Sequence, residues 1–256
     1  MPHCRWFDRL VGASLVTMAL LPQGDSVAAL AVPIVNHSGW TRLLQRHVHP
    51  DGRVDYAGFK ADEAALDEYL ALLARAKLDQ ALIPVQMIGF WINAYNACVI
   101  KGVLDHINDE GRFPVSVKDV PGFFDRITYH IGGEALTLNQ IEQRLRKFED
   151  PRVHFALVCA SRSCPDLRPE AFPEGDEMMA GVPLLLATLH FLAQPKGMQA
   201  DPAKKTLRLS MIFKWYAKDF GSVIDFVKRY APPQLRTLPL EQYRIEYLPY
   251  DWTLNR

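Results

Sequence analysis

A long apolar segment that follows Pro84 is the feature that most limits how this chain can fold. In VQMIGFWINAYNACVIKGVLDHI, apolar residues fall on nearly every side of a helical wheel instead of forming one stripe. A helix of this kind has to be surrounded by protein. Pro84 favours a helix start, because a proline in the first turn gives up no helical hydrogen bond. We therefore expect a central buried helix on which the rest of the chain packs.

Hairpin and capping signals downstream of this segment predict a small sheet next to a helix. RITYHI and EALTL flank Gly132-Gly133, a two-residue glycine turn typical of a hairpin. Thr137 and Gln140 fit a capping box that opens the helix NQIEQRLRKF. Hydrophobic spacing predicts further helices in WTRLLQRHV, ADEAALDEYLALLARA, MMAGVPLLLATLHFLAQ, WYAKDF and SVIDFVKRY, and extended segments in VDYAGF, RVHFALV and KTLRLSMIF. These elements follow no βαβ rhythm, which favours an α+β fold: a helix-rich single domain with a small, mainly antiparallel sheet.

The N-terminus has the pattern of a secretory signal. Arg5 and Arg9 precede the apolar run LVGASLVTMALL, and the small residues of SVAALA follow it. The apolar run is short for a membrane span, which needs about 20 residues. We expect a signal peptide over residues 1–31 with cleavage near Ala31, and a single domain over residues 32–256. The mature chain is then periplasmic or secreted, with no transmembrane segment.

Composition and missing motifs limit the classes of partner and cofactor that we expect. The chain has 29 basic and 29 acidic residues, a balance that does not favour nucleic acid or an anionic membrane. G-x-S-x-G, H-E-x-x-H, C-x-x-C, Walker A and G-x-G-x-x-G are absent from the sequence. We predict no cofactor and no metal, and the expected partner is a small-molecule or peptide ligand of unknown identity. A metal site formed by histidines that are distant in sequence is an alternative that the sequence leaves open.

The stretch HFALVCASRSCP carries the chemically most interesting residues. If residues 153–159 form a strand, His154 and Cys159 point to opposite faces. Cys159 or Cys164 is a candidate nucleophile, activated by a histidine or a nearby cation. Export would place both in an oxidising compartment, which favours a Cys159–Cys164 disulfide across the loop as the alternative. Metal ligation by these cysteines is the third interpretation.

Polar residues elsewhere could serve the same site. Asn93 and Asn96 share one face of the predicted central helix, and buried amides need hydrogen-bond partners. Asn93 could orient a base, or both amides could tie down neighbouring backbone. Asp251 could orient a histidine or bond a local turn. Cys98 is expected to be a packing residue.

Five motifs in order resemble one family. They are GRVDYAGF, FWINAYNA, HFALVCASRSCP, SMIFKWYAKDF and YDWTLN, spread from about Gly52 to Asn255. The chain resembles the domain of unknown function 547 family, a resemblance that implies no particular activity.

Two functions follow from the residues. The first is a cysteine-dependent hydrolase or acyl transferase that uses Cys159 or Cys164, His154, and Asn93 or Asp251. The second is a non-catalytic binding or structural module with a loop stapled by a Cys159–Cys164 disulfide. A pocket that joins Asn93, His154 and a free cysteine would favour the enzyme.

Overall fold

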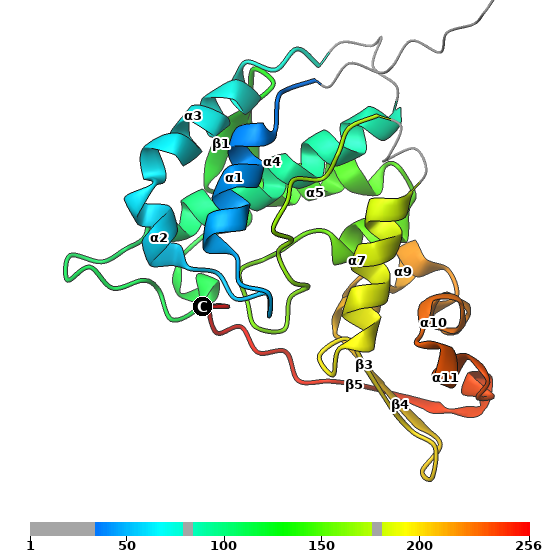
Figure 1. Ribbon diagram of the computed structural model, residues 1–256. Helices are drawn as coiled ribbons and strands as arrows, with labels where there is room; N and C mark the ends of the chain where they lie inside the picture. The colour runs from blue at the N-terminus through cyan, green and yellow to red at the C-terminus, as the bar shows by residue number, and fades with distance from the viewer. Residues whose placement is uncertain (1–33, 79–83, 176–180) are drawn as a thin grey trace, which may run out of the picture.

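The computed structural model describes residues 34–78, 84–175 and 181–256 (Figure 1). The predicted signal peptide and the start of the helix predicted from Met178 lie outside the described residues. Within them the fold is helix-rich α+β, as predicted, with one two-stranded and one three-stranded sheet.

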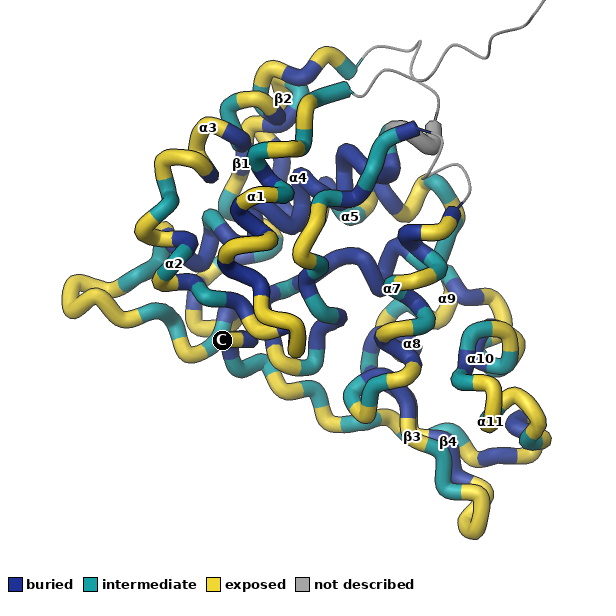
Figure 2. Tube along the Cα trace, in the orientation of Figure 1, coloured by how far each residue is buried: buried dark blue, intermediate teal, exposed yellow. Residues whose placement is uncertain are grey.

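The central buried helix is confirmed as α4, Pro84–Leu104. Every residue from Phe90 to Ile100 is buried, and the dark tube of Figure 2 follows this helix through the interior. Its segment Met87–Leu104 is long and apolar enough to cross a membrane, but 89% of it is buried inside the protein, as expected of a core helix. The helices that pack on it are α2 (Tyr56–Ala61), α3 (Glu63–Ala74) and α5 (Leu138–Arg146), and α1 (Ser38–His47) packs on α2 and α3.

The predicted hairpin and capping box are also confirmed. Strands β1 (Thr128–Ile131) and β2 (Glu134–Thr137) pair antiparallel. The two glycines between them have positive φ, the backbone conformation that this turn requires. Thr137 then caps α5, with Gln140 bonding back to the Thr137 backbone N–H. The hairpin thereby fixes where α5 begins, and so which residues of α5 face the interior.

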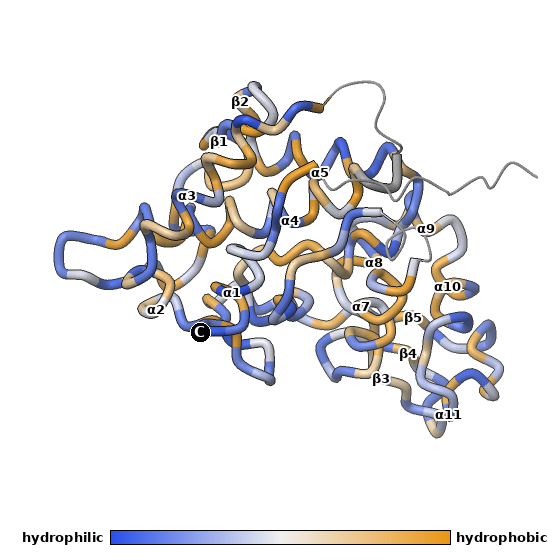
Figure 3. Tube along the Cα trace, turned by 45° about the horizontal axis from the view of Figure 1, so that its top comes forward, coloured by the Kyte–Doolittle hydropathy of each residue, from blue (hydrophilic) through white to orange (hydrophobic). Residues whose placement is uncertain are grey.

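A second hydrophobic cluster lies beside the α4 core, in the later part of the chain. Its aromatic centre contains Phe155, Phe191, Phe213, Phe220 and Phe226. In Figure 3 the hydrophobic stretches gather inside, whereas the hydrophilic loop around residues 108–112 projects from the molecule. The elements of this part are α7 (Val182–Ala193), β3 (Met198–Asp201), β4 (Thr206–Leu209), α8 (Ile212–Trp215), α9 (Ala217–Phe220), α10 (Val223–Tyr230), α11 (Pro233–Arg236) and β5 (Arg244–Tyr247). Strand β4 pairs antiparallel with β3 and parallel with β5.

Two predicted extended segments are wrong. VDYAGF forms α2, because the Asp55 side chain accepts the Gly58 N–H and caps a helix there. RVHFALV begins as the short 3-10 helix η2, Pro151–Phe155, with Asp150 as its cap and Pro151 in its first turn. The predicted alternation of His154 and Cys159 on a strand therefore does not exist. Two further 3-10 turns are η1 (Val117–Asp119) and η3 (Leu240–Gln242).

Candidate active site

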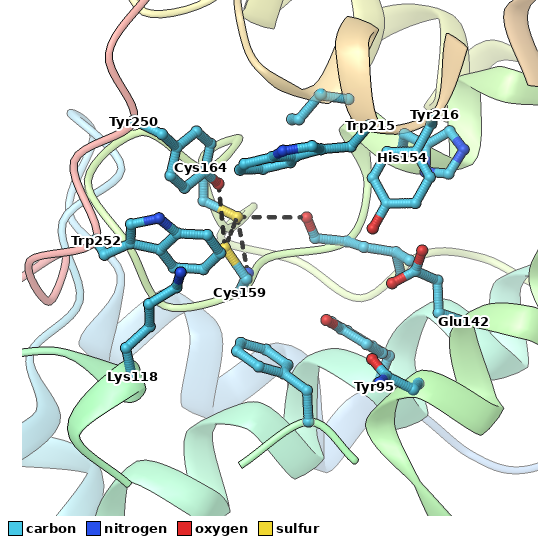
Figure 4. Close-up of a pocket in the computed structure, with 14 residues that line it drawn as sticks. Tyr95, Lys118, Glu142, His154, Cys159, Cys164, Trp215, Tyr216, Tyr250 and Trp252 are labelled. Carbon is cyan, nitrogen blue, oxygen red and sulfur yellow. Dashed lines mark hydrogen bonds between the residues drawn. The ribbon is translucent and has the colours of Figure 1, made fainter. Parts of the chain in front are cut away.

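A cavity of about 460 Å³ opens between the two hydrophobic clusters, and both cysteines of the HFALVCASRSCP loop line it (Figure 4). Its walls come from α4, α5, η2, α8 and the segment after β5. The lining residues are Tyr95, Lys118, Phe124, Asn139, Glu142, His154, Leu157, Cys159, Cys164, Ile212, Trp215, Tyr216, Tyr250 and Trp252. This volume suits a small organic ligand.

The cysteine loop, residues 156–164, is held in place from α4. The Asn96 amide donates to the Ala156 carbonyl at 3.0 Å, and its oxygen accepts the Val158 N–H at 2.9 Å. Asn96 is 3% exposed, so these are buried bonds with no water to replace them. The amide supplies the partners that a neighbouring strand would otherwise have to give this backbone.

The other end of the loop is held by residues late in the chain. The Arg162 N–H bonds to the Thr253 carbonyl at 2.9 Å, and the Asn255 N–H bonds to the Ala160 carbonyl at 3.1 Å. Ala160 has a φ of 63°, in the left-handed region that non-glycine residues seldom adopt. Such strain persists only where the surroundings hold it, and it gathers at functional sites. Here it directly follows Cys159.

The two thiols of the loop touch each other. Their sulfur atoms are 2.7 Å apart, and the Cys159 N–H also points at the Cys164 sulfur at 2.7 Å. A disulfide bond is about 2.05 Å long. Both residues are free cysteines in this structure, and the predicted bridge stays a prediction.

Hydrogen bonds make the Cys159 thiol acidic. Burial by itself raises its pKa, but hydrogen bonds from Cys164, Ser161 and Tyr250 lower that pKa to about 7. The Ser161 and Tyr250 hydroxyls each lie 3.2 Å from the Cys159 sulfur. Burial and the neighbouring Cys159 raise the pKa of Cys164 instead. Among the described residues, both hydroxyls bond to the Cys159 sulfur and none bonds to that of Cys164, so the geometry favours Cys159 as the thiolate and nucleophile.

Replacing Tyr250 with phenylalanine should raise the pKa of Cys159 and slow its alkylation at neutral pH about 2- to 10-fold, because one donor to the thiolate is lost. The measurement is the rate of iodoacetamide labelling from pH 5 to pH 10, which should have a midpoint about pH 7 in the wild type. Tyr216→Phe is the matched control, since that tyrosine lines the same cavity without a bond to the thiol. An unchanged midpoint in Tyr250→Phe would refute the assigned donor.

His154 faces the cavity but is bonded away from the thiols. Its Nε2 lies 2.8 Å from an Asp219 carboxylate oxygen, and its ring stacks on Tyr216 with centroids 4.0 Å apart. Burial lowers the pKa of His154, against the opposing effect of Asp219. Arg146 holds the pKa of Asp219 at about 2 through two hydrogen bonds, despite partial burial, and His154 adds to this. Among the hydrogen bonds of the described residues, none joins His154 to Cys159 or Cys164.

The other two predicted site residues lie outside the cavity lining. Asn93 exchanges two hydrogen bonds with the Phe172 backbone, at 2.8 and 2.9 Å, and so ties down a neighbouring segment. Asp251 accepts the Thr253 N–H at 2.9 Å, and its own N–H bonds to the Ser163 hydroxyl. The carboxylate that binds His154 therefore belongs to Asp219, and the prediction that Asp251 orients a histidine is wrong for His154.

Comparison with known families accounts for the middle of the chain. Residues 80–177 match the family model described as "Protein of unknown function, DUF547". The chain contains a DUF547 domain. No curated protein and no solved structure shows significant similarity to the chain. The match includes α4, α5 and the whole cysteine loop; the resemblance of the motifs outside it stays a prediction.

Within the DUF547 domain, sequence reasoning missed Glu142. It sits on α5 and lines the cavity, and burial raises the pKa of its carboxyl, against the effect of the nearby Tyr216 hydroxyl. In sequence it looks like one more charged residue of an amphipathic helix. The only available signal was its position directly after Ile141, a buried residue of α5.

The aromatic wall of the cavity comes from outside the matched region. The rings of Trp215, Tyr250 and Trp252 lie 4.7 to 5.7 Å apart, and Lys118 Nζ stands 4.2 Å from the Trp252 ring centroid. Trp215 is 45% exposed, so this wall reaches the surface. The described residues contain no group of three or more side chains that could hold a metal ion.

Proposed function

We propose that the protein is a cysteine-dependent hydrolase or acyl transferase with Cys159 as its nucleophile. One observation carries the proposal: the Cys159 sulfur lines a cavity of about 460 Å³ and has hydroxyl partners that lower its pKa to about 7. A thiolate available at neutral pH beside a ligand-sized space is the starting point of covalent acyl chemistry. With the export that the N-terminus indicates, the substrate would be extracytoplasmic.

In the first half of the reaction, the Cys159 sulfur forms a bond to the acyl carbon, and the bond to the leaving group breaks. The leaving group needs a proton, and the raised pKa of Glu142 favours the protonated form that can donate one. Tyr250 gives its hydrogen bond to the thiolate before attack, and as the bond from sulfur to the acyl carbon forms, the sulfur loses its negative charge and frees this donor for the developing oxyanion. Water or an acceptor then attacks the thioester, and the Glu142 carboxylate takes its proton.

His154 has a positioning role in this scheme. Its ring stacks on Tyr216, and the Tyr216 hydroxyl acts on Glu142. The Asp219 and Arg146 contacts hold the imidazole from the other side. His154 thus supports the acid–base group instead of the thiol.

A binding module is the second candidate, and the aromatic wall favours it. Tryptophan and tyrosine rings that line a cavity commonly bind ligands without any chemistry. In that case the cavity would hold a ligand and Cys159 would form no acyl intermediate.

The test is a search for an acyl-enzyme. The reduced protein is mixed with thioesters and p-nitrophenyl esters of graded chain length, quenched in acid and digested with trypsin. We expect an acyl group on peptide 153–162, which contains Cys159, together with a burst of released p-nitrophenol, and we expect neither in Cys159→Ser. Cys164→Ser should still acylate. Alkylation of Cys159 by iodoacetamide without acylation by any of the esters would contradict the proposal and favour the binding module.

A further inference from the structure

Cys164 is a cavity-lining thiol that the proposed acyl chemistry does not use. It is 3% exposed, and its sulfur lies 2.7 Å from the Cys159 sulfur. The Cys159 N–H bonds to the same sulfur, which also contacts the Leu157 carbonyl at 3.7 Å. The Cys164 side chain is therefore fixed from two sides, directly against the nucleophile.

The loop geometry keeps the pair together. Within the loop, the Cys164 N–H bonds to the Ser161 carbonyl at 3.1 Å and turns the chain back on itself. Asn96 holds one end of the loop, and the bonds to Thr253 and Asn255 hold the other. Bringing the sulfurs from contact to a bond of about 2.05 Å requires only a small movement, with no rearrangement of the fold.

We propose that Cys159 and Cys164 are a redox-active dithiol that reduces a hydroperoxide and closes into an intramolecular disulfide. The Cys159 thiolate attacks the outer peroxide oxygen, the O–O bond breaks, and the departing alkoxide or hydroxide takes a proton and leaves as alcohol or water. Cys159 is now a sulfenic acid. The Cys164 sulfur then attacks the Cys159 sulfur, the S–O bond breaks, and a water molecule leaves. An external thiol restores the pair by disulfide exchange.

This activity shares the Cys159 thiolate with the proposed function but needs no acyl substrate. It also predicts control of the acyl chemistry, since a bridged Cys159 has no nucleophile. Cys98 supplies an internal control: it is fully buried in α4, does not line the cavity, and burial raises its pKa.

In the test, the reduced full-length chain is mixed with hydrogen peroxide or cumene hydroperoxide at a concentration equal to that of the protein. After denaturing alkylation, trypsin is added without reductant. Cleavage after Arg152 and Arg162 places Cys159 in peptide 153–162 and Cys164 in peptide 163–196, because the Arg168–Pro169 bond resists trypsin. We expect these two peptides to appear linked and to separate on reduction, while the Cys98 peptide stays fully alkylated.

The Cys164→Ser variant tests the order of events. With no resolving thiol, Cys159 should stop at the sulfenic acid and give at least tenfold more dimedone adduct than the wild type. Three results would overturn the inference: Cys159 left unoxidised, Cys159 overoxidised without linked peptides, or equal dimedone labelling of both proteins. Linked peptides in a protein that no ester acylates would uphold the dithiol and refute the acyl chemistry. An acylated Cys159 in a protein that never gives linked peptides would uphold the acyl chemistry and refute the dithiol.

Discussion

Replacing Glu142 with glutamine is expected to slow breakdown of the acyl-enzyme about 100- to 10,000-fold, the usual contribution of a general acid–base group. Glutamine keeps the size of the side chain but can neither take nor give the proton. Burial raises the pKa of Glu142, which suits a carboxyl that changes its protonation state within the reaction cycle. The measurement is the decay of acylated peptide 153–162 after excess ester is removed.

Asn139→Ala is the control for this variant. Asn139 lies three residues earlier on α5 and lines the same cavity, but it is exposed and carries no proton to transfer. Alkylation of Cys159 by iodoacetamide should be unchanged in Glu142→Gln, because Glu142 is not a hydrogen-bond partner of the thiol. Wild-type decay in Glu142→Gln would remove the residue from the mechanism.

Replacing Asn96 with alanine should lower the free energy of unfolding by about 2–5 kcal/mol, since it leaves a buried carbonyl and a buried N–H without partners. Those groups belong to Ala156 and Val158, which lead into the cysteine loop. We therefore also expect the pH midpoint of Cys159 alkylation to rise as the loop loses the arrangement that places the hydroxyls on the sulfur. Urea denaturation at pH 7 and the alkylation profile measure the two effects.

Asn93→Ala is a closely matched control. Asn93 sits one turn away on α4 and also satisfies one carbonyl and one N–H, both from Phe172. It should cost a similar amount of stability and leave the alkylation of Cys159 unchanged. If both variants shift the midpoint alike, the effect comes from general loosening, and Asn96 has no special hold on the loop.

The correctly predicted elements are those that residues within the same short stretch of sequence determine. The apolar composition of α4, the glycine pair of the hairpin and the Thr137–Gln140 box each act within a few residues, and all three are seen. The failure at RVHFALV has a different origin. Its apolar composition suits a buried strand, but Asp150 and Pro151 start a 3-10 turn, and Asn96 satisfies the backbone that follows.

The candidate site was predictable only where chemistry is visible in a single residue. Cys159, Cys164 and His154 stand out by type and do line one cavity. Their partners do not stand out, because contacts across long stretches of chain choose them. Asp219 lies 65 residues from His154, and nothing in its sequence context separates it from Asp251. Glu142 is unusual only through burial, which a sequence does not display.

The acidity of Cys159 depends on a hydroxyl 91 residues further along the chain. In Figure 1 the segment after β5 runs back across the molecule to reach the loop. During synthesis the thiol therefore emerges from the ribosome long before Tyr250 does. A chain that ends before Tyr250 would lack this donor, and its Cys159 would be less acidic than in the finished protein. The full acidity of the thiol is therefore reached only after Tyr250 has been synthesised and has packed against the loop.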